Sequence, residues 1–450
     1  MQNENKVIRK EVWTIAIPAI LESLFTVFAS IIDTRMVSGM GKEAISAIAV
    51  TNQPRLFLMC VFFAINTTAA ALIARNLGKK DQRKSNEIFV TSLYMAVISC
   101  IFISVFSCLF AGYIMKICSG QADTMQMSID YFRIMMGGLI ANILFILINA
   151  AMRGCGYTKI TMVSNIIACL VNIFFNYCLI DGHLGFPALG VKGAAIATVM
   201  GNVAALIVST AAFTNSGLWV NLRYCLKERV RATRDALHDI MGMWRNICTE
   251  NVLLRVGFLF SSSITARIGS SDMALYSIGM TLMNISFAFG DGFQSAAVTL
   301  IGRVVGAGEQ ARVKSYNYML QMSGLICSIL MAALYVLLGH WYYSFFLTDL
   351  QLIRTGGLTN IIIAIICPIQ VAQVIYNGVL KSMGQTRLTL ISAVISVTII
   401  NPVALLILAL WLKLGIWGVW ASVLISQFAR CMLLHIQYKR EIRKPGYSPA

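Results

Sequence analysis

The chain has 450 residues, of which 58% are hydrophobic and 12% charged, and its mean hydropathy is +0.75. A soluble domain carries about a quarter charged residues, so a water-soluble fold would leave a large apolar surface exposed. The same figures exclude disordered, fibrous and small disulfide-rich proteins. The net charge of +17 does not indicate nucleic-acid binding, because the Lys and Arg residues lie in short loops between apolar runs. The composition predicts a polytopic membrane protein.

A helix needs about 20 apolar residues to cross the hydrocarbon core of a bilayer. The sequence contains about twelve such runs, which predicts an all-α membrane protein. We expect spans near residues 12–35, 46–74, 87–111, 127–152, 160–181, 190–215, 239–267, 273–302, 316–341, 352–380, 387–411 and 415–437. The first run is not expected to be a cleaved signal peptide, because it is too long and contains Glu22 and Asp33.

Most of the 36 Lys and Arg residues lie at the two ends of the chain and in the loops after even-numbered spans. Cytoplasmic loops of membrane proteins are enriched in these residues. We therefore expect both termini on the cytoplasmic side of a cell inner (plasma) membrane.

The two halves of the chain repeat each other at a constant offset. Residues 72–78 (LIARNLG) recur at 300–306 (LIGRVVG), and residues 153–159 (RGCGYTK) recur at 381–387 (KSMGQTR). Each half holds about six spans, an even number, which predicts parallel repeats with a shared site between two lobes, as in transporters. The expected parts are an N-terminal six-helix lobe (1–220), a basic cytoplasmic linker (221–238) and a C-terminal six-helix lobe (239–450).

Four acids lie within the predicted spans: Glu22, Asp33, Glu250 and Asp291. Ionisable residues at membrane depth are costly and are candidates for function by default. Glu22 and Glu250 are related by the repeat offset, and we expect both near the membrane midplane. Asp33 shares a helix face with Glu22 but corresponds to Ser261 in the second half, so the halves differ there. For Glu22 and Glu250, an interhelical hydrogen bond with only a packing role is the alternative.

Neutral polar residues accompany these acids. Asn172 and Asn176 in the fifth span, Thr198 in the sixth and Gln370 in the tenth offer oxygens that suit Na⁺ or a carboxyl group. Ordinary interhelical hydrogen bonding is the alternative for each. Pro18 lies one turn before Glu22, where it frees a backbone carbonyl and permits the helix to bend.

Three segments of the sequence resemble the multidrug and toxic compound extrusion (MATE) family: residues 18–41, with DTRMV at 33–37; residues 153–159; and residues 185–198. The resemblance covers nearly the whole chain. It implies two six-helix lobes that form a V, and export of organic cations driven by inward movement of H⁺ or Na⁺.

The resemblance also implies roles for individual residues. Family members use a first-span Asp that matches Asp33, near a bending Pro that matches Pro18. One branch completes a cation site with positions that match Asn172, Asn176 and Thr198, although an acid stands in that branch where this chain has Asn176.

Another branch of the family uses a seventh-span Glu, which matches Glu250, and a tenth-span Asp, where this chain has Gln370. The sequence is therefore a hybrid, and Glu22 and Asp291 are additional acids. A Na⁺ site is expected either at Asp33 with its neighbours or near Glu250, and the choice between H⁺ and Na⁺ stays open.

These observations favour a monomeric antiporter in the lipid bilayer that exchanges small organic cations for H⁺ or Na⁺, with no other cofactor. A lipid-linked saccharide flippase of the same superfamily is the alternative. Such a flippase needs basic residues for pyrophosphate, whereas the four embedded acids outnumber Arg55 and Arg255, whose partners stay open. An intramembrane enzyme is not expected, because HExxH, GxSxG and paired aspartate motifs do not occur.

Overall fold

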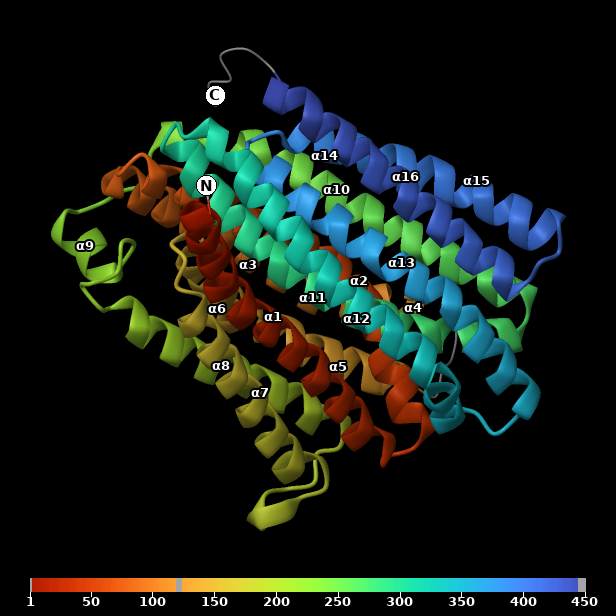
Figure 1. Cartoon of the computed structure of the whole chain (residues 1–450). Helices are drawn as coiled ribbons and strands as arrows, with labels where there is room; N and C mark the ends of the chain where they lie inside the picture. Colours follow the sequence, from red (N-terminus) through yellow and green to blue (C-terminus); the bar gives the residue numbers. More distant parts are fainter. Residues whose placement is uncertain (1, 119–123, 444–450) are drawn as a thin grey trace. The chain divides into compact units, whose positions relative to one another are not determined.

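The structure, a computed structural model, describes residues 2–118 and 124–443, and no strand occurs within those ranges. The first half contains α1 (Gln2–Ser38), α2 (Lys42–Gly78), α3 (Gln82–Leu109), α4 (Ala111–Cys118), α5 (Met125–Gly137), α6 (Leu139–Gly154), α7 (Thr158–Ile180), the short η1 (His183–Gly185), α8 (Val191–Phe213) and α9 (Leu222–Lys227) (Figure 1). The second half contains α10 (Arg234–Ile268), α11 (Ser270–Gly306), α12 (Gln310–Phe346), α13 (Leu350–Ser382), α14 (Thr386–Ala393), the π-helical η2 (Val394–Ile400), α15 (Asn401–Leu405), the π-helical η3 (Leu406–Trp411) and α16 (Ile416–Arg443).

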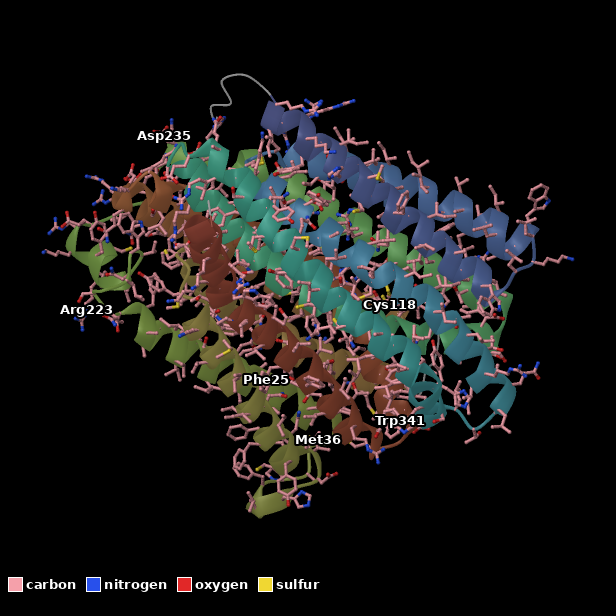
Figure 2. All side chains as sticks on the ribbon, in the orientation of Figure 1. Phe25, Met36, Cys118, Arg223, Asp235 and Trp341 are labelled. Carbon is pink, nitrogen blue, oxygen red and sulfur yellow. The ribbon has the colours of Figure 1, made fainter. Side chains whose placement is uncertain are left out.

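Within the described residues, 11 continuous helical segments are long and apolar enough to span a membrane. The pair α5 and α6, bent by 47° at Gly138, adds one more span and brings the number to 12. Large apolar side chains such as Phe25 on α1 and Trp341 on α12 are exposed (Figure 2), as expected of surfaces that contact lipid. The predicted fold class, about twelve transmembrane helices, is confirmed.

The chain divides into two compact units. One unit contains residues 1–20 and 245–450, and the other contains residues 21–244. In the first, α13 packs against α11, α12 and α16; in the second, α8 packs against α5, α6 and α7. The lobe boundaries expected from the repeat, at 220 and 239, stay a proposal, and the linker expected at 221–238 includes helix α9.

The repeat is visible in the turns as well as in the sequence. Gly156 after α6 and Gly384 after α13 have φ values of +90° and +80°. Their amides donate to Arg153 O and Lys381 O at 2.9 and 3.0 Å. Glycine is favoured at such helix ends because it adopts positive φ without steric cost. Arg153 and Lys381 therefore occupy equivalent positions in the equivalent turns of the two halves.

Gly201 sets how closely α8 approaches α7. A Cβ added there would lie 2.7 Å from Ala168 O and 3.0 Å from Asn172 Cβ. Gly201→Ala should therefore push the two helices apart, cost about 1–3 kcal/mol of stability and lower the melting temperature in detergent. Gly137→Ala is the control, because nothing lies within 4 Å of a Cβ at Gly137. Equal melting temperatures for the two variants would contradict this account of the α7–α8 contact.

Candidate functional site

The carboxylate of Asp33 on α1 accepts hydrogen bonds from asparagine side chains on α7. Asn176 Nδ2 donates to Asp33 Oδ1 at 2.7 Å. The amide of Asn172 is assigned with its nitrogen toward Asp33, because this orientation gives both of its polar atoms a partner. Its nitrogen then donates to Oδ1 and Oδ2 at 2.7 and 3.2 Å, and its oxygen accepts from Thr198 Oγ1 at 3.3 Å. The four residues Asp33, Asn172, Asn176 and Thr198 therefore form one cluster.

Two features make this cluster suitable for a cation. Asp33 is half-buried, and no ion pair to its carboxylate occurs among the described residues. Asn176 is 1% exposed, and its Oδ1 is a buried acceptor without a hydrogen-bond donor in the described part of the chain. A carboxylate beside an unpaired amide oxygen and a hydroxyl is a donor set of hard oxygens, which suits Na⁺ or a proton on the carboxylate.

Tyr131 on α5 adds an aromatic side chain near Asp33. It is 7% exposed, and the charges of both Asp33 and Arg55 act on its hydroxyl. The Arg55 guanidinium donates to Asn52 Oδ1 at 3.3 Å. Arg55 lies in the same unit as Asp33 and forms no ion pair with it among the described residues.

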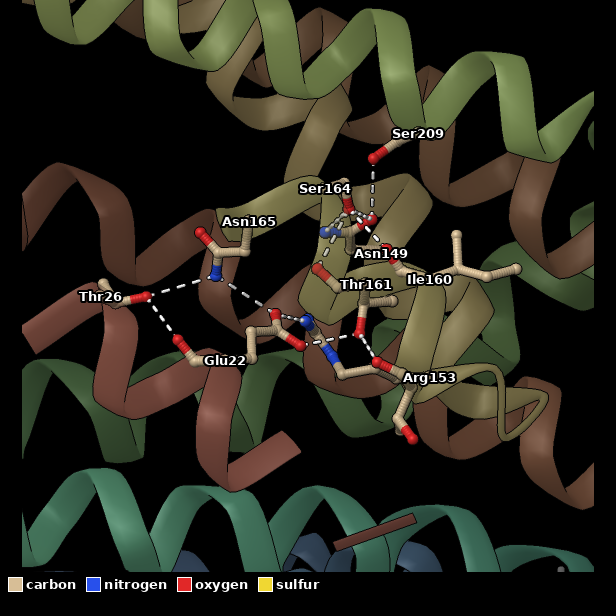
Figure 3. Close-up of polar contacts among 10 residues, drawn as sticks. Glu22, Thr26, Asn149, Arg153, Ile160, Thr161, Ser164, Asn165 and Ser209 are labelled. Carbon is tan, nitrogen blue, oxygen red and sulfur yellow. Dashed lines mark hydrogen bonds and ion pairs between the residues drawn. The ribbon is translucent and has the colours of Figure 1, made fainter. Parts of the chain in front are cut away.

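Glu22 lies in a different cluster, which Figure 3 shows. Its carboxylate forms an ion pair with Arg153 Nη1 at 2.7 Å and accepts from Thr161 Oγ1 at 2.7 Å. Asn165 Nδ2 lies 3.5 Å from Glu22 Oε1 and donates to Thr26 Oγ1 at 3.3 Å. Arg153 lies in the last turn of α6 and Thr161 in the first turn of α7, so this cluster joins α1 to the α6–α7 turn.

The depth expected for Glu22 and Glu250, near the membrane midplane, stays a prediction. Glu22 lies near the middle of α1 and Glu250 near the middle of α10, while their partners Thr161 and Thr389 lie in the first turns of α7 and α14. Helices α1 and α10 begin at Gln2 and Arg234, earlier than the hydropathy of the sequence predicts. Each acid therefore lies further from the start of its helix than expected.

Glu250 on α10 is more deeply enclosed than Glu22. Arg430 Nη2 and Lys381 Nζ lie 2.8 and 3.1 Å from its two oxygens, and the side chains of these three residues are between 1% and 6% exposed. Asn377 Nδ2 and Thr389 Oγ1 also donate to it, at 2.6 and 3.0 Å. Two buried cations already compensate this carboxylate, so the residues do not fit the Na⁺ site that the sequence allowed near Glu250.

The Glu22 and Glu250 clusters share one base and one threonine that the repeat relates. The repeat relates their shared partners: Arg153 corresponds to Lys381, and Thr161 corresponds to Thr389. Both threonines also donate to the backbone carbonyl three positions earlier. The sequence placed Arg153 and Lys381 in repeated motifs but indicated only their charge, not that each reaches the acid on the first helix of its half.

The Asp33 position differs between the halves. Its counterpart in the second half, Ser261, accepts from Asn401 Nδ2 at 2.9 Å, and both side chains are buried. At the repeat position of Asp33 the second half therefore has an uncharged side chain with an amide donor. Of these two equivalent positions, only that of Asp33 is ionisable.

Asp291 and Gln370 complete the predicted site residues, and both lie in the unit that contains Glu250. Asp291 is exposed in the middle of α11, where the charges of Lys381 and Arg255 act on it. Gln370 is fully buried on α13; its Nε2 donates to Met283 O at 3.5 Å. The structure does not place Gln370 among the partners of Glu250, because Asn377, two turns later on α13, occupies that role.

Comparison with known proteins agrees with this architecture. The MatE family profile matches residues 18–178 and again residues 247–407, so the second match begins within one position of the place where the repeat puts it. "Probable multidrug resistance protein NorM" of Thermotoga maritima is 24% identical over 428 residues, which cover 95% of this chain and 91% of the relative. "Multidrug export protein MepA" of Staphylococcus aureus is 24% identical over 426 residues, covering 94% and 92%.

Solved structures match the fold over almost the whole chain. A MOP superfamily transporter from Pyrococcus furiosus, described as having a binding pocket of reverse polarity, has a TM-score of 0.89 at 17% identity and covers 97% of this chain and 96% of its own. An outward-facing multidrug resistance MATE family transporter has a TM-score of 0.89 at 16% identity with the same coverage. Because the family profile matches both halves of the sequence, the chain belongs to the MatE family of multi-pass membrane transporters.

Proposed function

We propose that this chain is a secondary active antiporter that exports lipophilic organic cations in exchange for H⁺ or Na⁺. Its relatives NorM and MepA are described as multidrug resistance and multidrug export proteins, which supports the export of drugs and dyes. The enrichment of Lys and Arg in one set of loops supports a place in the inner membrane with both termini in the cytoplasm. In this proposal one monomer is the transporting unit.

The observation that most supports the proposal is the set of contacts that the Asp33 carboxylate makes. Its carboxylate has amide donors from Asn172 and Asn176 but no ion pair within the described residues, and the unpaired Oδ1 of Asn176 lies on one of these amides. An embedded carboxylate without a fixed counter-charge attracts a positive guest, because few alternative charges or waters are available at membrane depth.

The mechanism that follows is competition for one carboxylate. When Asp33 is ionised it binds the organic cation, with Thr198 and the amide oxygens as further acceptors. When a proton or Na⁺ occupies the same group, the attraction is cancelled and the organic cation leaves. Pro18, which lies earlier on α1, is proposed to let this helix bend between the two states.

The remaining acids take other roles in the proposal. Glu22 and Glu250 already have fixed basic partners, so they are poor candidates for the exchanged ion. Asp291 is exposed on α11 and is proposed to attract organic cations from its own surroundings. The embedded cations Arg153, Lys381 and Arg430 each pair with an acid, so these three are not available for a pyrophosphate, which disfavours the flippase.

The test is transport by the purified protein in liposomes. An H⁺ gradient and a Na⁺ gradient are imposed separately while the movement of ethidium, a neutral dye and an anionic dye is followed. We expect movement of ethidium alone, driven by one of the two gradients. Transport of the anionic dye alone, or no response to either gradient, would overturn the proposed function.

A further inference from the structure

The chain passes between its two compact units twice, and each passage lies inside a continuous helix. In α1 the boundary is between Ile20 and Leu21, and in α10 it is between Trp244 and Arg245. These are the first spans of the two repeats. The start of each of these helices therefore belongs to one unit, and the rest of the helix belongs to the other.

Before each boundary, the helix is tied to the unit that it leaves. On α1, Glu11 accepts a hydrogen bond from the Tyr316 hydroxyl of α12. On α10, Asp239 forms an ion pair with Lys84 of α3 at 3.2 Å. Glu11 and Asp239 are equivalent under the repeat, so an acid at the same repeat position makes an attachment in both halves.

Tryptophan side chains strengthen the same attachment. The Trp13 ring meets Phe293 of α11 edge to face, with 6.1 Å between ring centroids. Trp244 Nε1 donates to Val61 O of α2 at 3.1 Å. Helices α2 and α11 occupy equivalent places in the two repeats, so each tryptophan contacts the second helix of a repeat.

After each boundary, the helix is tied to the unit that it enters. Glu22 is the second residue past the first boundary and pairs with Arg153. Glu250 is the sixth residue past the second boundary and pairs with Lys381 and Arg430. The carboxylates that the repeat places at equivalent positions are thus the ion-paired groups that follow each boundary.

The residues between these attachments are suited to bending. Pro18 lies two residues before Ile20, and Gly242 lies two residues before Trp244. Proline removes one backbone hydrogen bond from a helix, and glycine lowers helix stability by about 1 kcal/mol relative to alanine. Each helix is therefore weakened just before its boundary and fixed on both sides of it.

We propose that Glu22 and Glu250 are positioning residues rather than ion-binding residues. Each anchors its helix to the unit beyond the boundary, so that movement of the units during transport is taken up by the short segments 18–21 and 242–245. The inference rests on the proposed transport function. It assigns the two acids to the conformational step and leaves Asp33 as the group that binds the exchanged ion.

The test separates turnover from binding in the Glu22 pair, which is less enclosed than the Glu250 cluster. Glu22→Gln is expected to lower the maximal transport rate about tenfold or more while leaving the Kd for ethidium and the pH profile unchanged. The charge swap Glu22→Arg with Arg153→Glu should restore the maximal transport rate to within about threefold of the wild-type rate. This is expected when the rate depends on the ion pair and not on either residue alone. Arg153→Lys, which copies the Lys381 arrangement, should retain most of the rate.

Several results would overturn the assignment. One is a weaker Kd or a shifted pH profile in Glu22→Gln. Another is a charge-swap protein that is folded, by size-exclusion chromatography and melting, yet as slow as the single variants. If Glu22→Gln itself does not fold, the transport rates of the charge-swap and Arg153→Lys variants test the assignment instead. Wild-type transport by Asp33→Asn would instead overturn the proposed ion site and leave the Glu22 result standing.

Discussion

Asp33→Asn is expected to lower gradient-driven export of ethidium by about 30-fold or more while the protein still folds. Asparagine has the shape of the protonated acid but cannot become negative, so the exchange between a bound ion and an organic cation is lost. Removing one partner of a buried charge pair costs about 2–5 kcal/mol, and a factor of ten per 1.4 kcal/mol converts this to a loss of about 30-fold or more. The measurement is ethidium transport in liposomes under each imposed gradient.

Ser261→Ala is the matched control, because Ser261 occupies the equivalent position of the second repeat. It removes the hydrogen bond from Asn401, which costs about 1 kcal/mol of stability, but it removes no charge. Transport close to that of the wild type is expected. If Asp33→Asn and Ser261→Ala behave alike, the competition mechanism at Asp33 is wrong.

Glu250→Gln is expected to lower the free energy of unfolding more than the substitutions at Asp33, Ser261 or Glu22. The substitution removes the one carboxylate that both Lys381 and Arg430 contact, and these side chains are 6% and 5% exposed. Removal of one partner from a buried ion pair costs about 3–5 kcal/mol, since the remaining charge stays out of water. The melting temperature of the detergent-solubilised protein should fall clearly, with a lower yield from the membrane.

Glu22→Gln provides the comparison for stability. Its pair with Arg153 has side chains that are 10% and 22% exposed, and a single cation is left behind. Its melting temperature should therefore fall less than that of Glu250→Gln. A Glu250→Gln protein that melts at or above the wild-type temperature would show that the two cations are hydrated in the folded protein.

The sequence predicted the fold well because membrane insertion imposes a strong pattern. Apolar runs had to match the bilayer thickness, and the break at Gly138 did not disturb the predicted span 127–152. The start of α1 was not predicted, because no apolar pattern marks it. Most residues before Trp13 are polar, so hydropathy ends the span there although the helix extends to Gln2.

The candidate site was predicted in part. Asp33, Asn172, Asn176 and Thr198 were grouped through the family resemblance, and the structure brings them together. The partners of Glu22 were not predicted, because Arg153 is far away in the sequence and its charge was explained by topology alone.

A comparison of the two acids under the repeat would have found these partners. The offset that relates Glu22 to Glu250 also relates Arg153 to Lys381, so a base accompanies the acid in both halves. The roles of Glu250 and Gln370 were harder to predict. Arg430, the second cation on Glu250, lies on α16, and nothing in the repeat motifs points to that helix.

The uncharged pair Ser261 and Asn401 has a consequence for energetics. In the proposed mechanism, Asp33 titrates and its repeat counterpart Ser261 does not, so competition at Asp33 would carry one monovalent ion inward against one monovalent drug outward in each cycle. Such a one-for-one swap moves no net charge across the bilayer. The membrane voltage then does no work on the exchange, and the concentration ratio of the ion alone limits how far the drug can be expelled.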